Sequence, residues 1–336
     1  MENLFHLDMV NLATLTLANG KTYGVATADP DASSLVAELA QAMQLRQDRE
    51  PESLLLVNVD GNAESYDGGN HRYTPDPPGI NKGGSADHAP GDPPSIEPDV
   101  DVDVIHCAAE HLVESDARAV QMMRVSQALV SPAWNEGALL VHSALIERDG
   151  WGVLLAGPGD VGKSTASKRI PKPWRAVCDD SALVVHDGHG AYWAHPWPTW
   201  SDFMYGGEGG RWDVGQAVRL KAIFFLEQAK VEQVEPVGVG KAICLLLESV
   251  GQAMQVSTFK MDESEKRAVH LQRFESVIAL MKDMPAYRLR LSKTGTFWDQ
   301  IDRVLEFDRK DNSRQEKQIS GNRLQETGSA GDRKDG

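Results

Sequence analysis

The stretch WGVLLAGPGDVGKSTASKRI, residues 151–170, decides the fold. Its centre, Gly157 to Ser164, matches the phosphate-loop pattern G-x-x-x-x-G-K-[ST] at every required position. The apolar run before this centre predicts a strand, and residues 165–170 predict a short helix that Pro171 ends. A strand, a glycine-rich turn and a helix in this order present backbone N–H groups to a phosphate. The sequence therefore predicts an α/β fold with a nucleotide-binding loop.

The residues of this loop have separate expected roles. Glycines let the backbone turn its N–H groups toward a phosphate, and Lys163 supplies positive charge near the β- and γ-phosphates. The Ser164 hydroxyl can bind Mg²⁺, so we expect ATP and Mg²⁺ as cofactors. The residues expected to bind the nucleotide are Gly157, Pro158, Gly159, Asp160, Val161, Gly162, Lys163, Ser164 and Thr165.

The composition excludes several classes of protein. The formal net charge is −15, which disfavours a general nucleic-acid binder because phosphate neutralisation requires a surplus of Lys and Arg. No stretch approaches the roughly 18 apolar residues that cross a membrane, and the N-terminus lacks the pattern of a secretory signal. Cys107, Cys178 and Cys244 show no zinc-binding spacing. We expect a cytoplasmic protein that binds neither nucleic acid nor membranes.

Changes in composition predict four parts along the chain. Residues 1–60 contain an Asn-Gly hairpin turn, a helical pattern and a further strand, which predict a small α/β module. Residues 61–100 are rich in Gly, Pro and Asp and predict a flexible linker. Strands and helices alternate over residues 101–307, with several hairpins, so the main domain should contain a mixed sheet. The polar residues 308–336 predict a disordered tail.

The order of elements around the loop is distinctive. Apolar runs flank a turn at residues 148–150, so a hairpin should lead into the loop, and the Asp-Asp pair 179–180 closes a later strand. His142 stands 163 − 142 = 21 positions before Lys163. This arrangement resembles the HPr kinase/phosphorylase and PEP-carboxykinase-like families, whose histidine precedes the loop lysine by the same interval. Ser143 departs from the family's glycine. The resemblance implies a P-loop core with a mixed β-sheet.

The same resemblance implies roles for the candidate catalytic and metal-binding residues. Asp180 aligns with the catalytic base, accompanied by Lys163 and His142, and Asp179 would bind the metal directly or through water. Glu208 is the available candidate for a further metal-binding glutamate. From the residues alone, the acidic pair could instead cap a turn, and His142 could be a hydrogen-bonded core residue. HPr kinases form hexamers, which implies a homo-oligomer here.

A second resemblance rests on segments spread over the main domain, residues 157–165, 179–180, 194–201, 223–226 and 295–298. They are similar to the SynChlorMet cassette protein ScmC, a divergent HPr-kinase-like family found beside radical SAM enzymes and a small peptide-binding, PqqD-like partner. This resemblance implies a role in peptide modification. The acceptor would then be a peptide or carrier protein, and the partners would be radical SAM proteins of the cassette.

Four tryptophans, Trp193, Trp197, Trp200 and Trp212, lie within twenty residues of one another. Core packing is the ordinary explanation for such a group. The alternative is an aromatic platform that stacks a nucleotide base or grips an extended peptide.

Two functions from different classes are compatible with these motifs. The first is an ATP- and Mg²⁺-dependent kinase that phosphorylates a hydroxyl on a peptide, a carrier protein or a small molecule. The second is a nucleotide-gated binding module that serves a partner enzyme without phosphoryl transfer. Decarboxylation of the PEP-carboxykinase kind ranks behind both, because the chain shows no evident carboxylate-binding arginine motif.

Overall fold

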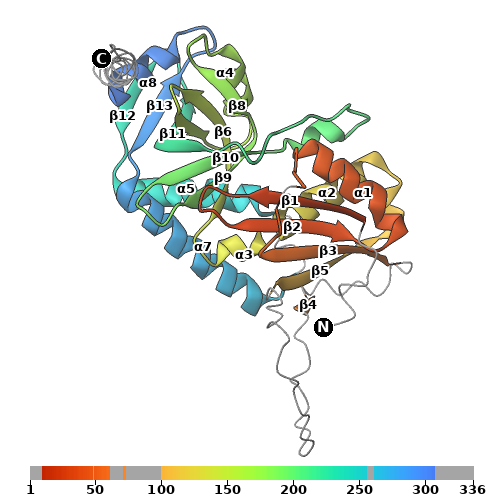
Figure 1. Ribbon diagram of the computed structural model, residues 1–336. Helices are drawn as coiled ribbons and strands as arrows, with labels where there is room; N and C mark the ends of the chain where they lie inside the picture. The colour runs from red at the N-terminus through yellow and green to blue at the C-terminus, as the bar shows by residue number, and fades with distance from the viewer. Residues whose placement is uncertain (1–9, 48, 61–70, 73–99, 256–260, 307–336) are drawn as a thin grey trace, which may run out of the picture.

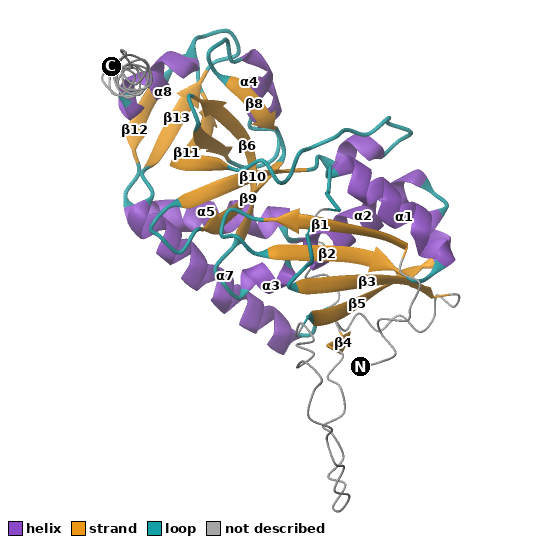
Figure 2. Cartoon of the chain, in the orientation of Figure 1, coloured by secondary structure: helices purple, strands orange, loops and turns teal. Residues whose placement is uncertain are grey.

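The computed structural model describes residues 10–47, 49–60, 71–72, 100–255 and 261–306 (Figure 1). Almost all of the predicted linker 61–100 and the whole predicted tail 308–336 lie outside these residues. The described chain is α/β, with two β-sheets and several helices (Figure 2). Both sheets contain parallel and antiparallel pairs, so the expected mixed sheet is confirmed.

The first sheet has the strand order β1-β2-β3-β5-β4. Its strands are β1 (Val10–Thr16), β2 (Thr22–Thr27), β3 (Ser53–Asp60), β4 (His71–Arg72) and β5 (Asp101–Ala108). The predicted Asn-Gly turn joins β1 and β2 as an antiparallel hairpin. Strands β2, β3 and β5 run parallel. Because parallel neighbours need a crossover connection, α1 (Pro30–Ala42) lies between β2 and β3 in the sequence.

Strand β5 extends the first sheet further along the chain than the composition indicates. Residues 101–108, assigned from the sequence to the main domain, pair with β3 along its whole length. Helix α2 (Ser115–Leu129) also packs against α1 and β3. Pairing between strands so distant in sequence leaves no local pattern, which is why the composition places this segment elsewhere.

The second sheet has the order β10-β9-β6-β7-β11-β13-β12, and β8 also pairs with β6. Its strands are β6 (Leu139–Arg148), β7 (Trp151–Ala156), β8 (Arg175–Cys178), β9 (Ser181–His186), β10 (Tyr192–Trp197), β11 (Val218–Gln228), β12 (Gln233–Pro236) and β13 (Ala286–Leu291). The hairpin expected before the loop is confirmed as β6–β7, and β9 and β10 form a further hairpin. Strand β10 also pairs with β11, so β10, β9, β6, β7 and β11 form a closed circuit.

Helices cover the second sheet and join the two sheets into one core. They are α4 (Lys163–Arg169), α5 (Val239–Ala253), α7 (Glu263–Asp283) and α8 (Phe297–Leu305), whereas α3 (Ser131–Trp134) contacts α2. Figure 1 shows α5 and α7 running from the second sheet toward the first. Buried residues of α5, such as Leu246, belong to the same hydrophobic cluster as Leu15 of β1. A second cluster, which includes Phe224 and Phe297, lies between β7, β11, β13 and α8.

A buried histidine connects the two sheets. His195 of β10 has no exposed surface, and its Nε2 accepts a hydrogen bond from the Ala18 backbone N–H at 3.1 Å. Its Nδ1 lies 2.7 Å from the Val214 carbonyl oxygen. Since Nε2 accepts, Nδ1 must carry the hydrogen and donate. Burial lowers the pKa of His195 to about 4, against the smaller opposing effect of the bond to Val214. The His195 ring is therefore neutral, with its hydrogen on Nδ1.

Residues 198–217, between β10 and β11, form a bridging segment that reaches from the second sheet to α1 and α2 (Figure 1). Its 3₁₀ turn η3 (Trp200–Phe203) packs against α2. The Trp212 N–H donates to the Ala42 carbonyl at the end of α1, at 2.7 Å. The Tyr205 N–H donates to Asp116 Oδ1 in the first turn of α2, at 2.6 Å. This segment carries a continuous set of contacts between the two sheets.

The tryptophan group is mainly a packing feature. Trp197 and Trp200 are buried in the shared core, and Trp193 and Trp212 pack against it.

No helix in the described part of the chain combines the length and apolarity needed to cross a bilayer.

Candidate functional site

The glycine loop spans residues 157–162, between the end of β7 and the start of α4. Gly157 has φ +154° and Gly162 has φ +107°, values that side-chain-bearing residues rarely adopt. A Cβ on Gly157 would lie 3.1 Å from Val161 Cγ1, so this glycine also provides needed space. The predicted strand, turn and short helix are all present. The glycines at both ends of the loop are required by its backbone.

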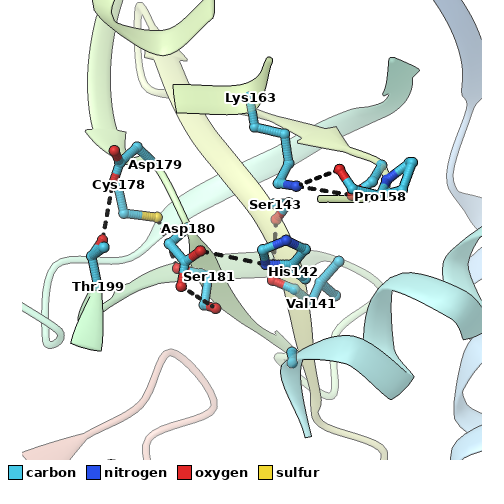
Figure 3. Close-up of polar contacts among 12 residues, drawn as sticks. Val141, His142, Ser143, Pro158, Lys163, Cys178, Asp179, Asp180, Ser181 and Thr199 are labelled. Atoms are coloured by element: carbon cyan, nitrogen blue, oxygen red, sulfur yellow. Dashed lines mark hydrogen bonds and ion pairs between the residues drawn. The ribbon is translucent and has the colours of Figure 1, made fainter. Parts of the chain in front are cut away.

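Lys163 is fixed by the loop that it closes. Its buried Nζ donates to the carbonyl oxygens of Gly157 and Pro158, both at 2.9 Å (Figure 3). An ammonium group has three N–H donors, so one remains for another acceptor. Burial lowers the pKa of Lys163, while Asp180 and then Asp160 oppose that shift. These two hydrogen bonds therefore fix the position of the Lys163 ammonium group at the loop.

Strand β6 lies between the glycine loop and the acidic pair. On one side its Ser143 pairs with Ala156, the last residue before the loop. On the other side β6 pairs with the end of β8 and the start of β9. The two residues between those strands are Asp179 and Asp180. The strand register thus brings the loop and the acids to the same stretch of β6, although they are well separated in sequence.

His142 and Asp180 face each other beside this stretch (Figure 3). His142 Nδ1 lies 3.5 Å from Asp180 Oδ1, and the two side chains are 20% and 38% exposed. Burial lowers the pKa of His142, and the charge on Lys163 lowers it further, whereas Asp180 raises it. The predicted catalytic residues His142, Lys163 and Asp180 therefore form one electrostatically coupled group.

Asp179 and Asp180 have different surroundings. Asp179 Oδ1 accepts a hydrogen bond of 2.8 Å from the hydroxyl of buried Thr199, and its Oδ2 lies 3.9 Å from Lys168 Nζ. Asp180 Oδ2 accepts only a long bond, 3.4 Å, from the Ser181 hydroxyl. Asp179 is thus held from the direction of the bridging segment, whereas Asp180 is the more open carboxylate.

The structure adds two site residues that the sequence analysis does not single out, Thr199 and Asp202. Asp202 lies in η3, and partial burial raises the pKa of its carboxyl group, followed by the effect of Asp179. Lys168 opposes this shift, and Asp180 adds to it. Thr199 lies inside the segment 194–201 that carries the ScmC resemblance, so that segment is the only sequence signal for it.

Glu208 is not brought to this group by any contact in the described part of the chain. It is an exposed residue of the bridging segment and makes no hydrogen bond or ion pair with the described site residues. The neighbouring Gly209 N–H donates to the Asp202 carbonyl at 2.9 Å. Among described residues, no group of three or more His, Cys, Asp or Glu side chains could hold a metal ion. The metal-binding role of Glu208 stays a prediction.

The comparison with known families covers this site completely. Residues 105–306 match the family described as SynChlorMet cassette protein ScmC. The matched region is more than half of the chain, runs from β5 to the end of α8, and contains every candidate catalytic, nucleotide-binding and metal-binding residue. No curated protein matches the chain. The chain belongs to the SynChlorMet cassette protein ScmC family.

Proposed function

We propose that the chain is an ATP- and Mg²⁺-dependent phosphotransferase with an HPr-kinase-like phosphate-loop core. The observation that carries this proposal is the grouping of Lys163 at the loop with His142 on β6 and Asp180 on the other side of that strand. Phosphoryl transfer needs a held positive charge at the phosphates and a carboxylate that orients and deprotonates the acceptor hydroxyl. The positive charge of Lys163 and the carboxylate of Asp180 lie on either side of strand β6.

The loop residues fit a nucleoside triphosphate. Lys163 has a donor beyond the two that hold the loop carbonyls, and burial lowers its pKa despite the opposing effects of Asp180 and Asp160. Ser164 and Thr165 are exposed residues in the first turn of α4. These residues would bind and orient the phosphates, which is most of what the reaction demands of a protein.

The residues that would hold Mg²⁺ are Ser164 and Asp179. When bound, Mg²⁺ would neutralise negative charge on the phosphates. Mg²⁺ is commonly held by one or two protein oxygens together with phosphates and water, and a hydroxyl and a carboxylate are ligands of the kind that it takes. Thr199 holds one oxygen of Asp179, which fixes the direction of the other oxygen.

Asp180 is the proposed base. Its Oδ1 lies toward His142 and more than a third of its side chain is exposed, so an acceptor hydroxyl can donate to it. A neutral His142 can donate its Nδ1 hydrogen and hold the carboxylate in one orientation. The cassette setting of the family supports a peptide or carrier protein as acceptor, with a small molecule as the remaining class. Radical SAM partners and a homo-oligomer stay predictions.

Radiolabel transfer tests the proposal. The full-length protein is incubated with γ-labelled ATP, Mg²⁺ and the precursor peptide and carrier proteins encoded beside it. We expect label on an acceptor with wild type, and a loss of at least about a hundredfold with Asp180→Asn, as general-base removal implies. Wild-type protein that binds ATP but labels none of these acceptors would contradict the phosphotransferase proposal.

A second candidate is a nucleotide-gated binding module. The bridging segment favours it, because Thr199 at its start contacts Asp179 while Trp212 near its end contacts α1. In this second function, nucleotide binding at the site changes the surface that the first sheet offers to a partner. In the cell, Asp180→Asn would then keep function while Lys163→Ala loses it; the phosphotransferase requires both to be inactive.

A further inference from the structure

The far end of β11 contacts the glycine loop. Gln228, the last residue of β11, donates from Nε2 to the Asp160 carbonyl oxygen at 2.9 Å and to the Val161 carbonyl oxygen at 3.4 Å. Strand β11 runs parallel to β7 and pairs with it as far as Ala156, the residue that precedes the loop. The end of β11 therefore lies beside the start of the loop.

We propose that Gln228 is a positioning residue for phosphate binding. A trans peptide unit holds its C=O and N–H in opposite directions. When the Asp160 and Val161 carbonyls point to Gln228, the N–H groups of Val161 and Gly162 point away from it. Neither N–H donates to any residue in the described part of the chain, so both remain available to donate to an anion.

The local backbone explains why such a clamp is needed. Asp160 has φ +59°, in the left-handed region that is costly for residues other than glycine. Asp160 is also exposed and lies outside any helix or strand. Lys163 holds the carbonyls of the first half of the loop, at Gly157 and Pro158. Gln228 holds those of the second half, so two side chains together fix the orientation of the loop's peptide units.

Gln228→Met tests this role, which rests on the proposed nucleotide site. Methionine keeps the length of the side chain and its neutral charge but removes the amide donors. The matched control is Gln233→Met on β12, which removes a glutamine whose Oε1 accepts from Arg290 Nη1 at 3.2 Å on the same sheet. Calorimetry measures the affinity of each full-length protein for Mg-ATP and for inorganic tripolyphosphate, and a thermal melt measures stability.

We expect Gln228→Met to lower the affinity for both ligands by about threefold to tenfold, the equivalent of one or two hydrogen bonds. The affinities of the Gln233→Met control should be unchanged. In wild type, NMR should show the Val161 and Gly162 amide resonances shifting on addition of tripolyphosphate. Unchanged affinity for both ligands in the methionine variant would overturn the inference, and so would a loss confined to ATP, which would place Gln228 at the nucleoside. Failure of folded wild type to bind either ligand would remove the proposed function, and this inference with it.

Discussion

At the scale of single residues, the site is governed by the balance between burial and three charges. Burial lowers the pKa of both His142 and Lys163. Asp180 raises both values, while the ammonium of Lys163 depresses that of His142 further. The protonation state of His142 therefore depends on which neighbour keeps its charge.

Substitutions that remove one charge at a time should shift the pKa of His142 in opposite directions. Lys163→Met removes a charge that lowers this pKa, so the value should rise. Asp180→Asn removes a charge that raises it, so the value should fall. NMR titration of the His142 ring resonances measures both shifts. Shifts of the same sign in the two variants would show that these three side chains are not coupled as described.

At the scale of elements, the parts predicted from the sequence are those with local signals. The hairpins β1–β2 and β6–β7, and helices α1 and α4, follow from turn residues and apolar spacing within one segment. Helix α2 has no such signal, because it buries Gln121, Ser126 and Gln127, which a hydrophobic pattern assigns to the solvent face. Strands β5 and β12 depend on partners elsewhere in the chain.

The candidate site divides in the same way. The loop and Asp180 can be proposed from motif and spacing, because each motif is contiguous. Thr199, Asp202 and Gln228 cannot, because their roles arise from contacts between segments that only the folded sheet brings together. Sequence patterns indicate the candidate groups for chemistry, whereas the groups that hold them in place depend on strand register.

The contact between the bridging segment and the acidic pair gives a prediction at this scale. Thr199→Val keeps the shape of a buried side chain but removes the hydroxyl that bonds Asp179. We expect a loss of about 1 kcal/mol in the free energy of unfolding, because the partly buried Asp179 carboxylate loses a hydrogen bond from a buried hydroxyl. Urea denaturation measures this loss. Thr199→Ser should retain most of the stability, and equal losses in the two variants would point to packing instead of the hydrogen bond.

At the scale of the whole molecule, the two sheets form one structure around a shared core. The family match begins within β5, so β1, β2, β3 and α1 lie outside it. These elements nevertheless contribute to the same hydrophobic cluster as α5 and α7. His195 and the bridging segment add polar contacts across the same boundary. Thr199, at the start of the bridging segment, contacts Asp179 of the candidate site.

Protonation of His195 should destabilise this junction. Its pKa is about 4 when folded and 6.5 as a free side chain, so only the unfolded chain gains the proton between these values. The stability from the neutral ring is complete above pH 6.5 and is lost as pH falls toward 4, by roughly 3 kcal/mol in all. Urea unfolding of wild type and His195→Gln across this range isolates the effect. Parallel curves for the two proteins would contradict it.

In the proposed function, the glycine loop that Lys163 closes binds a magnesium nucleotide. Calorimetric titration of the folded full-length protein with Mg-ATP measures this binding. We expect saturable binding by wild type and a loss in affinity of at least about tenfold in Lys163→Ala, since a charged hydrogen-bond donor is removed. Folded wild-type protein that takes up no Mg-ATP, or a Lys163→Ala variant that binds it equally well, would show that the loop is not a nucleotide site.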